Sequence, residues 1–315
     1  MNPIATRQSY GEELVQLGSQ NPNIVVLDAD LSGATMTKLF RQEHPDRFID
    51  CGIAEANMLT AAAGLATTGM VPFASTFAMF AAGRGFEQIR NSIAYPRLNV
   101  KICATHAGIS VGADGATHQA IEDLSLMRSI PGMVVLNPCD DKETRACLHA
   151  AHEYDGPVYI RLSRHPVEPV YTDCDFEIGR GKILKEGTDA ALIATGIEVQ
   201  ETLKAAEILE KEGIHCRVVD LATIKPVDKE LILDCARHCG RLVTVEEHNI
   251  IGGLGSAVAE TVSESCPVPI LRIGVEDCFG QSGNGNELLH AYGLDADSIA
   301  MRVLTFIHRS DKTKS

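Results

Sequence analysis

The sequence predicts an α/β protein with two domains, each built on a parallel β-sheet that helices cover on both faces. Short, continuously apolar runs alternate with longer amphipathic stretches up to about residue 162, and the alternation starts again near residue 190. Strands that are apolar along their whole length are typical of parallel sheets, and helices are the connections that such sheets need.

The first domain is predicted to span residues 1–170. Its first strand is the run Asn-Ile-Val-Val-Leu-Asp at 23–28, and four similar runs follow. The predicted strands are 23–28, 71–74, 99–104, 133–136 and 158–162, and the predicted helices lie near 9–18, 55–68, 79–94, 119–129 and 140–153.

A linker is predicted at 171–187, after Pro166 and Pro169, because this stretch is polar and rich in acidic residues. The second domain, 188–315, repeats the alternation at a smaller scale. Its predicted strands are 190–194, 216–219, 242–246 and 270–273, and its predicted helices lie near 197–212, 228–238, 254–263 and 285–291.

The composition limits the classes of function. A formal net charge of −14 over 315 residues argues against a nucleic-acid partner, which needs a basic surface. No run of about 20 apolar residues is present, so no membrane association is expected. The N-terminus lacks the basic and apolar regions of a secretory signal, so we expect a cytoplasmic protein.

The ten cysteines are scattered, mostly in apolar stretches, and are expected to be reduced core residues. Cys235, His238 and Cys239 form the tightest group, and the two thiols would share a helix face. A zinc site usually has four ligands, with a second close pair that this sequence lacks. We therefore expect no metal ligands from this group.

Glu55 is the first candidate for chemistry. It lies in the apolar helical stretch Gly-Ile-Ala-Glu-Ala-Asn-Met at 52–58. A carboxyl group that is buried in such surroundings tends to keep its proton, which suits acid–base work. The alternative is an exposed position on an ordinary helix.

Phe77 and Phe80 are three residues apart, a spacing that serves core packing or stacking on a flat ligand. A glycine-containing loop at 105–118 follows a predicted strand and holds His106, Asp114 and His118. Ligands collect where parallel strands end, so these side chains could bind sugar hydroxyls and move protons. A plain surface loop, or metal ligation by Asp114 and His118, remains open.

Arg164 follows the predicted strand 158–162, and Arg84 lies close behind Phe80. Guanidinium groups suit phosphate, although a surface ion pair is the alternative for each. In the second domain, Glu246-Glu247-His248 precedes a glycine-rich turn at 252–255. This turn does not have the dinucleotide-binding spacing and is interpreted as a tight strand-to-helix connection.

Five motifs in this order resemble the C-terminal half of transketolases, from about residue 10 to residue 303. They are Gly-Ile-Ala-Glu-Ala-Asn-Met, Ser-Thr-Phe-Ala-Met-Phe, Ala-Thr-His-Ala-Gly, Gly-Ala-Asp-Gly-Ala-Thr-His-Gln and Leu-Ser-Arg. The resemblance implies a pyrimidine-binding domain, a transketolase C-terminal domain and a thiamine diphosphate cofactor. It also implies transfer of a two-carbon ketol unit from a ketose phosphate to an aldose or aldose phosphate.

The resemblance assigns roles residue by residue. Glu55 would activate the pyrimidine ring, Phe80 would stack on it with Phe77 beside it, and Asp30 would lie near the cofactor at a subunit contact. His106, Asp114 and His118 would contact the sugars, with the two histidines handling protons. Arg164 would bind the acceptor phosphate, and Arg84 is a further candidate for substrate binding.

The sequence departs from the family at two positions. A phosphate-binding serine is replaced near Ala34, and an aromatic residue expected after Phe80 is Gly83. Both departures leave the acceptor phosphate and the length of the sugar open.

The sequence also lacks the Gly-Asp-Gly with a later Asn that holds Mg²⁺ and the diphosphate. We therefore expect a separate N-terminal subunit to supply the Mg²⁺ ligands, and self-association of the resulting pair. The alternatives are a β subunit of a 2-oxoacid dehydrogenase decarboxylase component, a 1-deoxyxylulose-phosphate-synthase-like enzyme, and a non-catalytic partner subunit.

Overall fold

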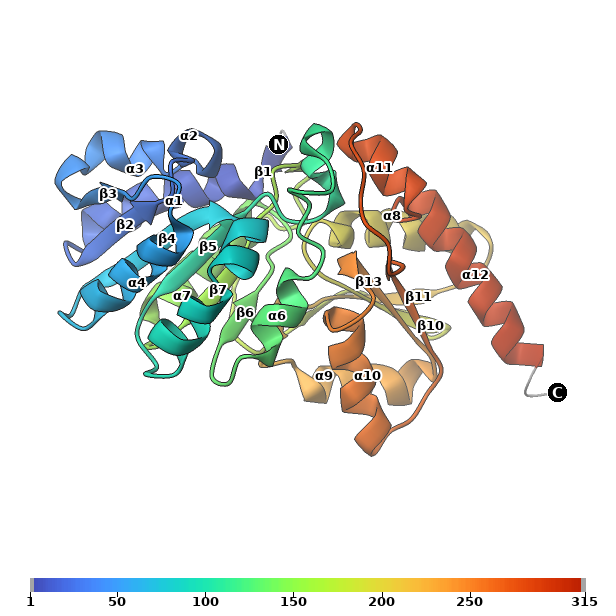
Figure 1. The fold of residues 1–315 in the computed structure, drawn as a ribbon. Helices are drawn as coiled ribbons and strands as arrows, with labels where there is room; N and C mark the ends of the chain where they lie inside the picture. The colour runs from blue at the N-terminus through green and yellow to red at the C-terminus, as the bar shows by residue number, and fades with distance from the viewer. Residues whose placement is uncertain (1–2, 313–315) are drawn as a thin grey trace.

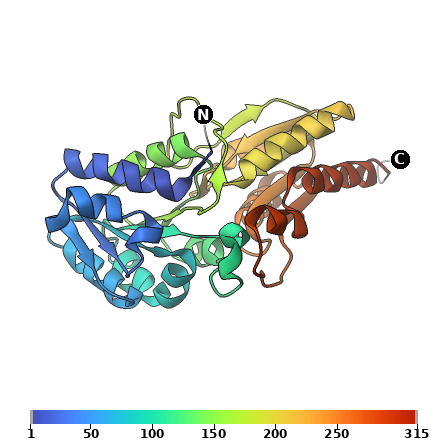
Figure 2. The same cartoon turned by 90° about the horizontal axis from the view of Figure 1, so that it is seen from above.

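The computed structural model describes residues 3–312 and shows two α/β lobes side by side (Figures 1 and 2). The first lobe holds a seven-stranded sheet and the second a five-stranded sheet, and both are mainly parallel. The predicted fold class is confirmed. A short antiparallel pair, β1 (Ile4–Ala5) and β8 (Pro166–Val167), joins the two ends of the first lobe.

The first sheet has the strand order β12-β6-β7-β5-β4-β2-β3. These strands are β12 (Thr223–Lys225), β6 (Val134–Leu136), β7 (Val158–Arg161), β5 (Lys101–Thr105), β4 (Val71–Phe77), β2 (Ile24–Asp28) and β3 (Phe48–Asp50). All neighbours are parallel except β12 and β6.

The helical segments of the first lobe are α1 (Thr6–Gln20), α2 (Ser32–Thr35), α3 (Lys38–Glu43), η1 (Pro45–Arg47), α4 (Glu55–Ala66), η2 (Phe80–Arg84), α5 (Phe86–Gln88), η3 (Ile89–Ala94), η4 (Ile109–Asp114), α6 (Asp123–Ser129) and α7 (Asp141–Glu153). The helix predicted at 79–94 is present, but η2 and η3 within it are π-helical turns. Such turns are frequent at functional sites, and η2 carries both Phe80 and Arg84.

The second sheet has the order β14-β13-β10-β11-β9. Its strands are β14 (Ile270–Val275), β13 (Leu242–Asn249), β10 (Ala190–Ala194), β11 (Cys216–Asp220) and β9 (Lys182–Lys185), and its helices are α8 (Glu198–Lys211), α9 (Lys229–Cys239), α10 (Leu254–Ser265), α11 (Gly285–Ala291) and α12 (Ala296–Lys312). Strand β9 pairs antiparallel with β11 and lies inside the segment 171–187, which the sequence analysis treated as a linker.

Two further expectations need correction. The helix predicted at 119–129 begins only at Asp123, because the backbone of Ala120 is bridged to Ala107 in the preceding loop. Strand β12, from the second half of the chain, completes the first sheet by pairing with β6.

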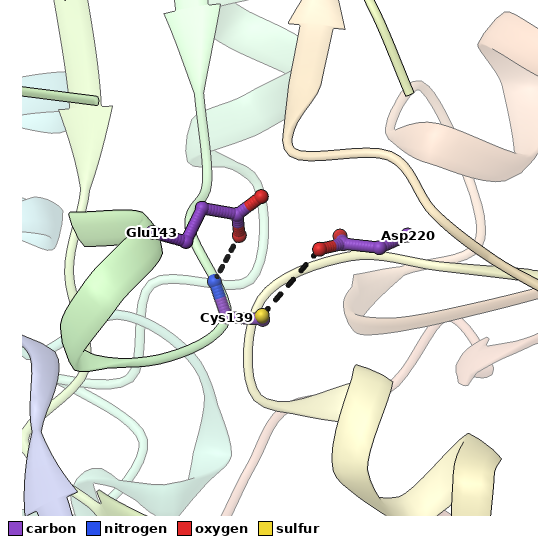
Figure 3. Close-up of side chains that lie close together, drawn as sticks. All are labelled: Cys139, Glu143 and Asp220. Carbon is purple, nitrogen blue, oxygen red and sulfur yellow. Dashed lines mark hydrogen bonds between the residues drawn. The ribbon is translucent and has the colours of Figure 1, made fainter. Parts of the chain in front are cut away.

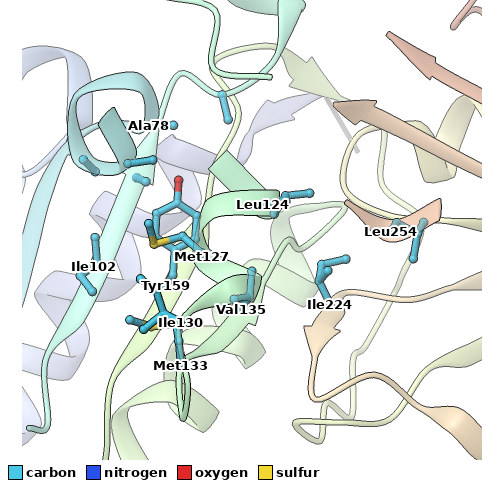
Figure 4. Packing of buried hydrophobic residues seen from close by; sticks show 14 of the residues in the cluster. Ala78, Ile102, Leu124, Met127, Ile130, Met133, Val135, Tyr159, Ile224 and Leu254 are labelled. Atoms are coloured by element: carbon cyan, nitrogen blue, oxygen red, sulfur yellow. The ribbon is translucent and has the colours of Figure 1, made fainter. Parts of the chain in front are cut away.

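The two lobes share a hydrophobic core. Ile224 and Leu254, from the second half of the chain, belong to the same buried cluster as Leu124 and Val135 (Figure 4). Burial of such side chains is the main favourable contribution to folding, so the junction is part of the folded core. Among the described residues, no helix is long and apolar enough to span a membrane.

Candidate active site

The predicted site residues gather where neighbouring strands of the first sheet end. Phe77 is the last residue of β4, His106 directly follows β5, and Arg164 follows β7 by three residues. Strands β7, β5 and β4 are adjacent and parallel, so these ends meet at one edge. This edge is where ligands bind in open α/β sheets.

Glu55 is the first residue of α4 and is only 4% exposed. Its Oε1 atom accepts a hydrogen bond from Arg84 Nη1 at 3.0 Å. The Arg84 guanidinium carbon lies 4.1 Å from the centroid of the Phe80 ring, which is cation–π geometry. Glu55, Arg84 and Phe80 are therefore brought together, with Arg84 between the other two.

Three rings form a continuous stack beside this ion pair. Phe77 lies 5.6 Å from Phe80 and 3.8 Å from His106, measured between ring centroids, and the planes are within 22° of parallel in both pairs. His118 meets the edge of Phe80 at 5.4 Å. Phe80 and His118 are half-buried and Arg84 is exposed, so this face can receive a flat ligand or a partner surface.

His106 is held on both ring nitrogens. Its Nε2 lies 3.2 Å from Arg7 Nη1, and its Nδ1 lies 2.9 Å from Thr105 Oγ1. A guanidinium group can only donate, so Nε2 is the acceptor and Nδ1 carries the proton. Burial, together with the charges of Arg7 and Arg164, lowers the pKa of His106 to about 3, so the imidazole is neutral at physiological pH.

The backbone of His106 is also unusual, because its φ of +57° lies in the left-handed region. Residues other than glycine adopt this region rarely, and such positions cluster at functional sites. The turn sends the chain from β5 directly into the loop that carries Asp114 and His118. The sequence alone gave no sign of this turn.

Arg7 is a site residue that the sequence analysis missed. It lies in the first turn of α1, where its Nη1 also donates to the carbonyl oxygen of Ala34 at 2.8 Å. Burial and the charge of Arg164 lower the pKa of Arg7, which shows that the two cations lie close together. The sequence signal was weak, since Arg7 is a single cation near the N-terminus.

Arg164 and Asp114 are paired with each other. Arg164 Nη1 lies 3.0 Å from Asp114 Oδ2 and 3.2 Å from the carbonyl oxygen of Val111. Both side chains are about 40% exposed, at 41% and 37%. The ion pair is therefore open to exchange with a ligand.

Asp30 stands apart from these contacts. It is exposed, has a φ of +61°, and its amide donates to Asp50 Oδ1 at 3.2 Å. It lies two residues after β2, next to β4 at the same sheet edge. Among the described residues, its amide contacts Asp50 and not the ring stack.

Near Ala34, the two neighbouring hydroxyl residues differ in their environment. Thr35 Oγ1 donates to Asp28 Oδ2 at 2.7 Å and is buried, so it is not available to a ligand. Ser32 is half-buried in the first turn of α2. Gly83, where an aromatic residue was expected, is exposed, and a Cβ atom there would lie 2.8 Å from Met79 Cε.

The cysteines of the second domain do not form a metal site with His238, because that histidine is exposed whereas Cys235 and Cys239 are buried. A different group, Cys139, Glu143 and Asp220, brings its ligand atoms within 4.8 Å of one another at the junction of the lobes (Figure 3). The sequence did not indicate this group, because Asp220 is 81 residues away from Cys139 along the chain.

Several of the atoms in this junction group that could bind a metal ion already form hydrogen bonds within the protein. The Cys139 amide donates to Glu143 Oε2 at 2.7 Å, and Cys139 Sγ and Tyr171 Oη donate to Asp220 Oδ2 at 3.4 and 2.7 Å. Burial raises the pKa of both carboxyl groups, and the charge of Asp220 raises that of Glu143 further. These shifts favour the protonated form of both carboxyl groups.

Comparisons with known proteins identify the family. Residues 2–169 match the transketolase pyrimidine-binding domain, and residues 179–299 match the transketolase C-terminal domain. The chain belongs to the transketolase family. The resemblance drawn from the five motifs is thereby confirmed.

Individual relatives agree with this assignment. The chain is 54% identical to a Methanocaldococcus jannaschii protein provisionally described as a transketolase C-terminal section, over 95% of each. It is 45% identical to a 6-deoxy-6-sulfo-D-fructose transketolase subunit of Clostridium sp. (strain MSTE9), over 93% of this chain and 91% of that protein.

A solved structure described as a split-gene transketolase in an inactive beta4 tetramer is 54% identical, with a TM-score of 0.89 over 97% of this chain and 99% of that one. These relatives do not favour a 2-oxoacid dehydrogenase subunit, a 1-deoxyxylulose-phosphate synthase or a non-catalytic subunit as the function of the chain.

Proposed function

We propose that this transketolase-family chain transfers a two-carbon ketol unit from a ketose phosphate to an aldose or aldose phosphate, together with a separate N-terminal subunit. The observation that carries the proposal is the Glu55–Arg84–Phe80 arrangement at the sheet edge. A buried carboxyl beside an accessible aromatic face suits a nitrogen-containing aromatic ring, and this is the pyrimidine of thiamine diphosphate in the family.

The described residues fit that ring. The planar guanidinium of Arg84 lies over the face of Phe80 and also donates a hydrogen bond to Glu55. A flat ring could occupy the same place. Bound thiamine diphosphate would supply the carbanion chemistry that breaks and forms the carbon–carbon bond. Glu55 would bind the pyrimidine ring, and Phe80, supported by Phe77, would stack on it.

The other residues would bind and orient the sugars. His106 is neutral and protonated on Nδ1, and its Nε2 accepts a hydrogen bond from Arg7 Nη1 that a sugar hydroxyl would have to replace. His118 meets the edge of the Phe80 ring. These two histidines would exchange protons with sugar hydroxyls. Asp114 would accept a hydrogen bond from an acceptor hydroxyl.

Arg7 and Arg164 make the region around His106 positive, which suits an anionic group on the sugar. We propose a phosphate as that group. The relative named for 6-deoxy-6-sulfo-D-fructose makes a sulfonate the substrate to compare with it. Arg84 would take part in substrate binding once it is released from Glu55.

Three observations support a partner: the absence of the Gly-Asp-Gly and Asn pattern in this sequence, the relative described as a C-terminal section, and the structure described as a split-gene transketolase. We propose that the N-terminal subunit holds Mg²⁺ and the diphosphate, that Asp30 lies at that contact, and that the pair self-associates. We also propose a cytoplasmic location and no nucleic-acid or membrane partner.

The test is calorimetry with thiamine diphosphate and Mg²⁺ on this chain alone, on an N-terminal transketolase subunit alone, and on their mixture. Tight binding in the mixture only, with turnover of xylulose phosphate plus ribose phosphate, is expected. Turnover of pyruvate plus glyceraldehyde phosphate instead would refute the proposed reaction.

The Glu55→Gln variant gives a sharper test in the same mixture. The amide keeps the size and one acceptor oxygen but cannot exchange a proton as a carboxyl does, so turnover should fall by about a hundredfold or more. The apparent Tm should change little, because Glu55 is paired with the exposed Arg84. Wild-type turnover would refute the role of Glu55.

A further inference from the structure

The loop that carries the proposed sugar-binding residues, 106–119, packs against the second domain. Gln119 Nε2 donates to the carbonyl oxygen of Gln281 at 2.9 Å. A Cβ atom at Gly112 would lie 3.1 Å from the carbonyl oxygen of Gly283, and one at Gly115 would lie 2.5 Å from Ser282 Oγ. The backbone of the second domain therefore forms the wall behind Asp114 and His118.

One side chain of the second domain reaches further into this loop. Glu247, on strand β13, is 2% exposed, and its Oε1 accepts a hydrogen bond from the Ser110 amide at 2.5 Å. Its carboxyl group also lies where a Cβ atom of residue 108 would be, and Gly108 has a φ of +81°. The loop therefore needs a glycine at this position to admit the carboxyl group.

Burial of the carboxyl group of Glu247 costs free energy, and its contacts offset this cost only in part. Burial raises the pKa of Glu247 to about 7, while the positive charge of Arg161 and the Ser110 amide act in the opposite direction. Arg161 also donates from Nη2 to the backbone carbonyl of Glu247 at 2.8 Å and pairs with Asp123. A fully desolvated acid that contacts the back of a site loop calls for a role.

We infer that Glu247 is a positioning residue, through which the second domain fixes the loop of His106, Asp114 and His118 for the transferred sugar. The inference rests on the proposed function and deepens it, because it gives the second domain a part in that reaction. The contact that carries it is the hydrogen bond from the Ser110 amide, four residues from His106 and four from Asp114.

The alternative explanation is that Glu247 only stabilises the fold. The neighbouring residue, Glu246, provides a matched control. Glu246 is also fully buried and accepts hydrogen bonds from the amides of Leu254 and Gly255, both at 2.7 Å. Those amides begin α10 of its own domain. Loss of Glu246 should thus destabilise the fold without releasing the site loop.

The experiment compares Glu247→Ala, Glu247→Gln and Glu246→Ala with wild type. Amide hydrogen exchange is measured on the full chain for peptides within 106–119. The KM for ribose phosphate and kcat are measured with the N-terminal subunit, thiamine diphosphate and Mg²⁺. Glu247→Ala should speed exchange in the loop and raise KM by about tenfold, because a buried amide loses its acceptor. Glu247→Gln keeps an acceptor and should stay within about twofold of wild type.

Glu246→Ala should lower Tm at least as much as Glu247→Ala, with loop exchange and KM near those of wild type. Wild-type exchange and KM in Glu247→Ala, or equal changes in Glu246→Ala, would overturn the inference. If the wild-type pair shows no ketol transfer, the proposed function fails. The exchange measurement then decides alone whether Glu247 holds the loop.

Discussion

Arg84 Nη1 donates to Glu55 Oε1 at 3.0 Å while the same guanidinium lies 4.1 Å from the centroid of Phe80. The carboxyl and the aromatic face that we propose for the pyrimidine ring are thus both in contact with a cation of the same chain. Arg84 is 54% exposed and sits at the end of the π-helical turn η2, so it can move away. A ring that binds between Glu55 and Phe80 has to displace it.

We therefore expect Arg84→Met to tighten cofactor binding by the reconstituted complex. Methionine keeps an apolar stem but removes the donors that compete for Glu55. Because Arg84 is exposed, water screens its ion pair with the buried Glu55, and we take the pair to contribute about 0.5 kcal/mol. The Kd for thiamine diphosphate should therefore fall by about two- to threefold. Calorimetry measures this change, with Arg90→Met, another exposed arginine, as the control. Weaker binding would instead mean that Arg84 holds the cofactor.

The positive region around His106 predicts how the enzyme selects its acceptor. Arg164→Gln removes a cation that forms an ion pair with the half-exposed Asp114. A charge-assisted hydrogen bond contributes about 1.5–3 kcal/mol, so KM for ribose phosphate should rise about tenfold or more, with little change for an unphosphorylated aldose.

The same substitution at Arg180, an exposed arginine paired with Glu230, is the matched control for Arg164. It should leave both KM values unchanged. An equal rise of KM for phosphorylated and unphosphorylated aldoses in Arg164→Gln would show that this arginine does not read the phosphate.

Ala34 offers a gain-of-function prediction. Its carbonyl oxygen accepts a hydrogen bond from Arg7, and the resemblance to the family implies a phosphate-binding serine near this position. Ala34→Ser should lower KM for ribose phosphate by about two- to fivefold, the value of one added hydrogen bond. A sulfonated sugar assayed in parallel tells whether the alanine favours a sulfonate over a phosphate.

The site could be predicted from sequence where its residues belong to one contiguous motif. Glu55, Phe80, Asp114 and His118 lie in runs that resemble the family, and the alternation of apolar strands placed their segments at strand ends. Phe77, His106 and Phe80 come together because β4 and β5 are parallel neighbours. Their positions at one sheet edge follow from topology alone.

The parts that could not be predicted depend on contacts between distant segments. Arg7 reaches His106 across 99 residues, and Glu247 reaches Ser110 across 137 residues. Strand β12 joins the first sheet although it comes after β9, β10 and β11 of the second sheet along the chain. No local sequence pattern indicates this pairing. Local periodicity carries no information about such pairings.

The junction of the lobes predicts an unusual dependence of stability on pH. The carboxyls of Glu143, from α7, and Asp220, at the end of β11, are buried side by side, and the pKa of each is raised. In the unfolded chain both titrate near pH 4. Above that pH the folded state binds more protons than the unfolded state, so the free energy of unfolding falls as pH rises toward the folded-state pKa values.

Glu143→Gln should reduce this slope, because glutamine keeps an acceptor for the Cys139 amide but has no proton to lose, and it no longer repels the charge of Asp220. We expect the fall in apparent Tm between pH 5 and pH 8 to be smaller by about 2 °C than in wild type. Glu177 is an exposed acid that lines the same surface pocket as Glu143 and Asp220, and Glu177→Gln should keep the wild-type slope. Calorimetric scans across this pH range measure the difference. Added Zn²⁺ tests the alternative that Cys139, Glu143 and Asp220 bind a metal ion. If Zn²⁺ raises the Tm of wild type but not of Glu143→Gln, a cation rather than protonation neutralises the two buried carboxylates.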